Sequence, residues 1–186
     1  MTLDGFCDHT AIGPDEEIHQ HYADLLATAD EVLYGRITYQ LMQFWQHLVK
    51  NPSGEKSMDD FAVAMDKVPK IVFSRTLTNV DWESARLADR NLEEEVLALK
   101  QSRPALGRSG SRDILVGSRS VIIQLMKLNL IDEYQLCVHP VVAGSGLPLF
   151  ENLKDRTVLK LIKTKTFGSG AVMLYYEPAK EKTTNR

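Results

Sequence analysis

The chain has 186 residues, of which 44% are hydrophobic and 25% charged, a composition typical of one globular domain with its own core. Its formal net charge of −3 excludes the overall basic field that draws proteins to nucleic acid or to anionic membranes. Its apolar runs are far shorter than the roughly 20 residues that cross a bilayer, and the first residues lack a signal-peptide pattern. We therefore expect a cytoplasmic protein without nucleic-acid or membrane partners.

The first part of the chain alternates helical and strand-like patterns of apolar residues. Apolar residues spaced three or four apart indicate helices, and short apolar runs bounded by Gly or Pro indicate buried strands. The predicted elements are a helix over 15–27, a strand over 32–34, a helix over 36–48, a helix over 57–66 with Ser57 as its N-cap, and a strand over 70–73.

The second part continues the alternation and ends differently. Its predicted elements are a strand over 82–87, a helix over 91–101 capped by Asn91, an exposed loop over 102–112, a strand over 114–116, a helix after Ser118, a strand over 131–138 and a hairpin of strands 158–167 and 171–177. This order predicts an α/β fold with a mixed, mostly parallel sheet, helices on both faces and a C-terminal antiparallel hairpin. We expect a single domain over residues 1–178 and a solvated tail over 179–186.

Three of the predicted strands end in the same chemistry, a small or hydroxylated residue beside an arginine. The three turns are Gly35-Arg36 with Thr38, Ser74-Arg75-Thr76, and Gly117-Ser118-Arg119-Ser120. Ligands of open α/β sheets bind outside the carboxyl ends of the strands, so these turns are expected to converge on one anionic ligand. Arginine forks match phosphate oxygens, and helix starts add partial positive charge. Each turn by itself is more typical of an ordinary helix cap or polar turn than of a ligand site.

The cysteines and two of the histidines favour structural roles. Cys7 and Cys137 are too few and too far apart for a disulfide framework or a metal knuckle, so we predict buried free thiols. His19 and His21 are two residues apart and do not share a helix face, so no metal site is predicted.

Six short motifs are distributed over nearly the whole chain. They are Thr2-Leu3-Asp4-Gly5-Phe6, Gly35-Arg36-Ile37-Thr38-Tyr39, residues 70–77 (KIVFSRTL), Val116-Gly117-Ser118, residues 130–134 (LIDEY), and residues 139–142 (HPVV) with 144–150 (GSGLPLF). In sequence, order and spacing they resemble the motifs of the dihydrofolate-reductase-like proteins related to the reductase domain of bacterial riboflavin biosynthesis. The resemblance implies a dihydrofolate-reductase-like fold with a central twisted mixed sheet, and NADPH as cofactor.

The resemblance also implies roles for individual residues in the cofactor half of the site. Those expected to bind NADPH are Gly35, Arg36 and Thr38 at the phosphates, Ser74, Arg75 and Thr76 at the adenosine 2′-phosphate, and Gly117, Ser118, Arg119 and Ser120 at the pyrophosphate. Arg119 falls at a position that varies in the family. On the substrate side, Asp4 would face the nicotinamide as the tentative catalytic residue, and Gly144, Ser145 and Gly146 would form the rim.

The activity implied is the NADPH-dependent reduction of a small polar substrate. It would be similar to 5-amino-6-(5-phosphoribosylamino)uracil reductase or dihydrofolate reductase, in a protein that can form homodimers. The alternative is a non-catalytic nucleotide or small-molecule binding module on the same fold. A third possibility, an oligomeric scaffold without ligand, predicts that the three arginines point to separate surfaces.

Two departures from the family pattern leave alternatives open. A core strand precedes the motif at residues 2–6 in the family, whereas this sequence begins at Met1, so either the start is truncated or the sheet is closed in another way. The acidic helical residue that protonates dihydrofolate has no unambiguous match among Asp15, Glu16, Glu17 and Asp24, and none is assigned.

Overall fold

The computed structural model describes residues 1–7, 13, 15–102, 113–153 and 156–179. These residues form two compact units, each described by itself below. One unit comprises Pro14–Leu128, and the other comprises Met1–Gly13 together with Asn129–Arg186. The predicted loop over 102–112 lies outside the described residues except for Ser102, and the predicted tail except for Ala179. Within the described ranges, no helix has the length and apolar content that crossing a bilayer requires.

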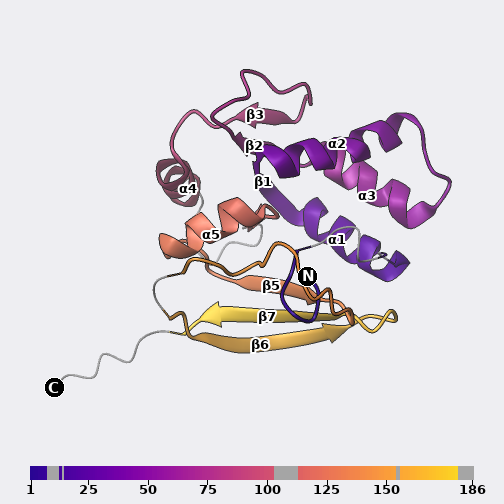
Figure 1. Ribbon diagram of the computed structural model, residues 1–186. Coiled ribbons are helices and arrows are strands. Elements are labelled where there is room, and N and C mark those ends of the chain that lie inside the picture. The colour runs from indigo at the N-terminus through magenta and orange to yellow at the C-terminus, as the bar shows by residue number, and fades with distance from the viewer. Residues whose placement is uncertain (8–12, 14, 103–112, 154–155, 180–186) are drawn as a thin grey trace. The chain divides into compact units, whose positions relative to one another are not determined.

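The unit Pro14–Leu128 is built on a parallel sheet of four strands in the order β3-β2-β1-β4 (Figure 1). Its elements are α1 (Glu16–Thr28), β1 (Ala29–Gly35), α2 (Arg36–Lys50), α3 (Lys56–Lys67), β2 (Lys70–Phe73), β3 (Ala85–Leu87), α4 (Leu92–Gln101), β4 (Asp113–Val116) and α5 (Arg119–Lys127). The chain runs outward from β1 to β2 and β3 and then returns to β4 on the other side of β1. The direction of winding therefore changes between β1 and β4, the place where open α/β sheets bind ligands.

The central strands are buried because their sequences are almost continuously apolar. Val32, Leu33 and Tyr34 of β1 and Val72 of β2 are all buried, as parallel strands covered by helices require. Trp82 is buried in the same core, and its indole Nε1–H donates to the Asp66 carboxylate at 2.6 Å.

Four helices begin where the sequence predicts, and α3 does not. Asp15 caps α1, and Asn91 caps α4 by accepting from the Glu94 N–H at 3.0 Å. The prediction that Ser57 caps the third helix is wrong, because α3 has Glu55 as its N-cap and buries Ser57 in its first turn. The carboxylate of Asp59 explains the earlier start, since it reaches back and accepts the N–H groups of residues 53 and 54.

Strand β3 is shorter than the predicted strand over 82–87. The Ala85 N–H donates to the Trp82 carbonyl at 2.8 Å, and this bond closes a turn before the strand can begin. Trp82 is buried in the core, but it is not part of the sheet. An apolar run on its own does not distinguish these two reasons for burial.

The other unit contains an antiparallel sheet of three strands in the order β5-β7-β6. Its strands are β5 (Tyr134–Val138), β6 (Leu159–Thr166) and β7 (Val172–Pro178). The predicted terminal hairpin is confirmed, and β5 begins three residues later than predicted. The α/β class with parallel strands and a C-terminal antiparallel hairpin is also confirmed, with the strands divided between two sheets.

The first residues of the chain lie along the end of β5. The Met1 ammonium donates to the Cys137 carbonyl at 2.7 Å, the His139 N–H donates to the Met1 carbonyl at 2.9 Å, and Thr2 forms an isolated parallel bridge with His139. No disulfide joins the two cysteines. Cys137 is buried, whereas Cys7 is half-buried, so the prediction of burial is wrong for Cys7. Cys7 lies in a surface segment whose backbone pairs with Leu147 instead of entering the sheet.

A lysine is buried at the start of β2. Lys70 is 1% exposed, and its ammonium donates to the Val68 carbonyl at 2.9 Å and the Ser84 hydroxyl at 2.7 Å. The ammonium also lies 3.9 Å from the centre of the Trp82 ring. Burial lowers the pKa of Lys70 from 10.5 to about 8, because desolvation disfavours the charged form.

We predict that Lys70 makes stability increase with pH in the alkaline range. Between pH 8 and 10.5 the unfolded chain binds this proton and the folded chain does not, so folding gains about 3 kcal/mol across the interval. Lys70→Met should lose this gain, whereas Lys67→Met, at an exposed position, should keep it. Urea unfolding of the three proteins at pH 7.5, 9 and 10.5 measures the difference. If the free energy of unfolding increases with pH by the same amount in Lys70→Met and in the parent protein, the prediction is wrong.

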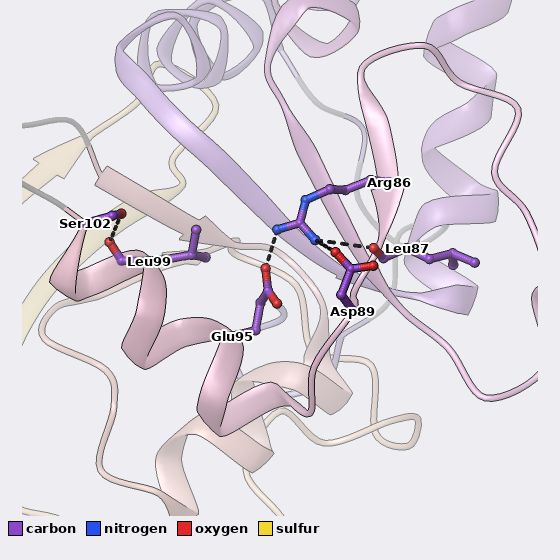
Figure 2. A network of polar contacts seen from close by, with 6 residues as sticks. All are labelled: Arg86, Leu87, Asp89, Glu95, Leu99 and Ser102. Atoms are coloured by element: carbon purple, nitrogen blue, oxygen red, sulfur yellow. Dashed lines mark hydrogen bonds and ion pairs between the residues drawn. The ribbon is translucent and has the colours of Figure 1, made fainter.

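An ion pair connects β3 to α4. Figure 2 shows the Arg86 guanidinium between Glu95 of α4 and Asp89. Arg86 Nη2 donates to Glu95 Oε1, and Nη1 donates to the Leu87 carbonyl at 3.3 Å. The Glu95 side chain is only 3% exposed, so its carboxylate depends on Arg86, whereas Asp89 is 87% exposed.

We predict that Arg86→Met lowers the free energy of unfolding by about 2 kcal/mol, because it leaves the buried Glu95 carboxylate without its charged partner. The double variant Arg86→Met/Glu95→Met should recover most of the loss, since neither charge is then buried. Asp89→Ala, which removes the exposed contact, should change stability by less than about 0.5 kcal/mol. Denaturant unfolding of all four variants, Glu95→Met included, gives the coupling energy. Additive effects would refute the dependence of Glu95 on Arg86.

Candidate functional site

The three predicted anion-binding turns lie at one edge of the parallel sheet. Strand β1 pairs with β2 and with β4, all in the same direction, so the carboxyl ends of the three strands lie together. Gly35 at the end of β1 is opposite Phe73, directly before the Ser74 turn, and Leu33 is opposite Val116, directly before Gly117. The turn after β1 is therefore in the middle, with the other two beside it.

One buried hydroxyl joins the turn after β1 to the turn after β4. Ser118 is 2% exposed, and its Oγ accepts from the Gly35 N–H at 3.0 Å and from the Thr38 hydroxyl at 3.0 Å. The bonds connect residues 80 or more positions apart in sequence. Ser118 thus holds the starts of α2 and α5 against each other.

Glycine at position 35 allows this close approach. A Cβ atom on Gly35 would lie 3.0 Å from Ser120 Oγ and 3.1 Å from Ser118 Oγ, closer than nearly all real contacts of a Cβ. The φ angle of Gly35 is −83°, which any residue can adopt, so space and not backbone conformation requires glycine here.

The starts of α2 and α5 differ electrostatically from those of α1 and α4. Neither α2 nor α5 has a side-chain cap or an acidic residue in its first turn; both helices are described in full. Instead, the first residues of α2 and α5 are Arg36 and Arg119. By contrast, α1 and α4 are capped by Asp15 and Asn91 and are acidic in their first turns. Uncapped N–H groups and an arginine at each start give the paired starts of α2 and α5 the chemistry that attracts an anion.

The turn after β2 is held by its own serine. Ser74 Oγ accepts from the Thr76 N–H at 3.1 Å and from the Leu77 N–H at 2.9 Å, a local turn that leaves Arg75 and Thr76 exposed. Arg36 is also exposed, and its guanidinium bonds to Gln40 Oε1 at 3.1 Å. The guanidinium of Arg75 at one end of the site and that of Arg36 in the middle both reach solvent.

Asp4 lies in the other unit, beside the predicted glycine rim. Its carboxylate accepts from the Thr2 hydroxyl at 2.6 Å, the Gly144 N–H at 2.7 Å and the Ala143 N–H at 3.1 Å. These bonds, the Thr2 hydroxyl first, lower the pKa of Asp4 from 3.8 to about 2. Asp4 is therefore ionised at neutral pH, and in this geometry it holds the loop at Gly144 and does not donate a proton.

The rim residues themselves form a tight loop. Gly144 and Gly146 have φ angles of +75° and +147°, in the region that favours glycine. A Cβ on Gly146 would also lie 3.4 Å from the Phe6 side chain. Ser145 between them is exposed. The structure thus brings Asp4 and this rim together, as the sequence predicts.

The structure also contains a cavity that the sequence did not indicate. It lies between α1, α2 and the start of α3 and has a volume of about 550 Å³. Its lining residues are Glu16, His19, Phe44, Trp45, Glu55, Lys56, Ser57 and Met58. None of the three anion-binding turns contributes to it. A tryptophan and a histidine on successive helices were the available signal, but they fit an ordinary core equally well.

Over nearly its whole length, residues 1–173, the sequence matches the RibD C-terminal domain. The chain belongs to this family. The resemblance identified from the six motifs is thereby confirmed.

Similar proteins and structures agree with the family. The chain is 35% identical to the protein YyaP of Bacillus subtilis (strain 168), over 95% of this chain and 90% of YyaP. A pyrimidine reductase-like protein from Corynebacterium diphtheriae has the same fold, with a TM-score of 0.61 at 14% identity over 97% of this chain and 89% of that one. Acinetobacter baumannii RibD also shares the fold, with a TM-score of 0.57 at 12% identity; the match covers 96% of this chain and 56% of RibD.

We predict that Asp4 stabilises this RibD-type domain above pH 4 and loses this effect in acid. Its folded pKa of about 2 lies below its ordinary 3.8, so its contribution is complete above that value and disappears as the pH falls toward 2. Asp4→Asn should be less stable at pH 7 and show a smaller decrease in stability between pH 4 and 2. Thermal unfolding across that range measures both effects, with Glu83→Gln, at an exposed position, as the control. If the stability of Asp4→Asn decreases between pH 4 and 2 as much as that of the parent protein, the assignment is wrong.

Proposed function

We propose that the chain is an NADPH-dependent reductase that passes hydride to a small polar substrate in the cytoplasm. The observation that carries the proposal is the pair of helix starts joined by Ser118. NADPH supplies the hydride when it is bound, and the protein supplies position and charge.

The residues at this edge fit the charges of NADPH. The N–H groups of the first turns of α2 and α5 suit a pyrophosphate, which needs several donors at close range. Gly35 lets the Ser118 and Ser120 side chains lie close to the backbone between the two helix starts. Arg36 and Arg119, the first residues of α2 and α5, add positive charge there. Arg75, exposed on the neighbouring turn, is the residue we assign to the 2′-phosphate.

The family and the names of its structural relatives support the substrate class that we propose. We propose a nitrogen heterocycle, such as the ring of a phosphoribosylamino-uracil or a pterin. The similarity to a pyrimidine reductase-like protein and to RibD supports a pyrimidine first. The loop at Gly144, Ser145 and Gly146 with Asp4 is the region we assign to the substrate side.

A second candidate is a non-catalytic binding module on the same fold. The positions of two carboxylates favour it, since Asp4 is ionised and bonded to three donors and Asp15 accepts from the Ile18 N–H at 2.7 Å as a helix cap. Neither is then available to donate a proton to a substrate. Tight NADPH binding without oxidation of the cofactor across pyrimidine, pterin and carbonyl substrates would identify this function.

We predict that the protein binds NADPH more tightly than NADH. Arg75→Ala should weaken NADPH about tenfold, the effect of one charged hydrogen bond, and change NADH little. Arg36→Ala should weaken both cofactors, because both carry the pyrophosphate. Titration calorimetry measures the affinities, with Lys50→Ala, which removes an exposed cation at the opposite end of α2 from Arg36, as the control. If neither cofactor binds at millimolar concentration, the proposed function is wrong.

A further inference from the structure

The cavity between α1, α2 and α3 has the features of a second ligand site. Its volume of about 550 Å³ is within the range of small-molecule pockets, which are largely apolar and carry a few placed polar groups. The aromatic wall is continuous, since Trp45 packs edge-on against Phe44, Phe61 and His19 with ring centres 5.3, 4.5 and 5.7 Å apart. A flat aromatic molecule suits such a wall.

Two buried polar side chains line this cavity. His19 is 8% exposed and Ser57 is 7% exposed. Among the described residues, neither the His19 ring nor the Ser57 hydroxyl has a hydrogen-bond partner. Buried polar groups are normally bonded, so these two are placed to bond with a molecule in the cavity.

The first turn of α3 adds further donors at the same place. Ser57 and Met58 belong to this turn, whose N–H groups have no partners within the helix. The N-cap residue Glu55 makes no side-chain capping bond to them. These N–H groups and the Ser57 hydroxyl are donors, so the matching ligand atom is an acceptor oxygen.

The charged residues at the rim select against an anion. Glu16 and Glu55 are both exposed carboxylates there, and the Lys56 ammonium is engaged by Asp60 in an ion pair. The two glutamates disfavour a ligand carboxylate, but only weakly because both lie in water. For the same reason a ligand cation would gain little from them. The lining therefore favours a neutral acceptor.

We propose that this cavity binds a neutral aromatic molecule bearing a carbonyl oxygen, with the ring against Trp45 and the oxygen bonded by Ser57, the first turn of α3 and His19. His19 is placed to serve as a neutral imidazole, since burial lowers its pKa. The site is separate from the anion-binding turns and goes beyond the proposed function.

Four probes of similar size test the proposal: acetophenone, ethylbenzene, benzoate and benzylamine. Titrations followed by ¹H–¹⁵N NMR contain no NADPH, so their outcome is independent of cofactor binding. Acetophenone should bind most tightly and shift the indole signal of Trp45, but not that of Trp82, which is buried in the core. If none of the probes shifts Trp45, or if ethylbenzene, benzoate or benzylamine binds as tightly as acetophenone, the proposal is overturned.

Variants identify the groups that recognise the oxygen. His19→Phe keeps a ring against Trp45, and Ser57→Ala removes one hydroxyl. Each should weaken acetophenone about five- to tenfold and leave ethylbenzene unchanged. His47→Phe on α2 is the matched control, because His47 is exposed and does not line the cavity. If acetophenone binds both His19→Phe and Ser57→Ala as tightly as it binds His47→Phe, the assigned contacts are wrong.

Discussion

The hydroxyl of Ser118 is the contact on which the arrangement of the anion site depends. Ser118 follows β4, and its hydroxyl accepts two hydrogen bonds from the segment that follows β1. One comes from the Gly35 N–H and the other from the Thr38 hydroxyl. The bond from the Gly35 N–H is buried and the bond from Thr38 is partly buried. A buried N–H left without a partner costs about 1–3 kcal/mol, so the contact holds the two helix starts together. Glycine at 35 is the steric condition for the same contact.

This contact also explains why the helix starts remain open to a ligand. A serine at the N-cap usually bonds to its own helix, but the Ser118 hydroxyl is used by the neighbouring turn. Helix α2 has a glycine at the same position and so has no capping atom at all. Both helices therefore have N–H groups in their first turns that no side chain caps, and a phosphate group could accept hydrogen bonds from them.

Much of the fold could be predicted from the sequence because local signals and burial agree there. Strand β2 and helix α4 begin and end within one residue of the prediction, since Pro69 precedes the first and Asn91 caps the second. The prediction fails where the type of a residue suggests one structural role and its place in the fold gives it another. Trp82 belongs to a turn before β3, so its burial in the core does not mark a strand. Ser57 has the residue type of an N-cap but lies inside its helix, because Asp59 accepts a hydrogen bond from the preceding loop.

The grouping of the three turns was predictable from the sequence, but their contacts were not. Glycine, serine and arginine mark three strand ends, and the parallel pairing of β1 with β2 and β4 brings these ends to one edge of the sheet. The sequence does not show that Ser118 is buried, nor that the first turns of α2 and α5 are left without a side-chain cap. The cavity could not be predicted, because its lining comes from three helices whose packing depends on the whole unit.

Helix α2 contributes to both proposed sites, and the charges near its start differ from those near the cavity. Arg36 is at its start, beside the uncapped N–H groups, whereas Phe44 and Trp45 lie on the order of 12 Å further along the helix. There they line the cavity together with Glu16 of α1 and Glu55, the N-cap of α3. A polyanionic cofactor would be attracted to the start of α2 and disfavoured at the cavity rim, whereas a neutral ring would meet no repulsion there and would gain the aromatic wall. On these two proposals, charges from three helices sort two ligands that differ in charge, without any moving part.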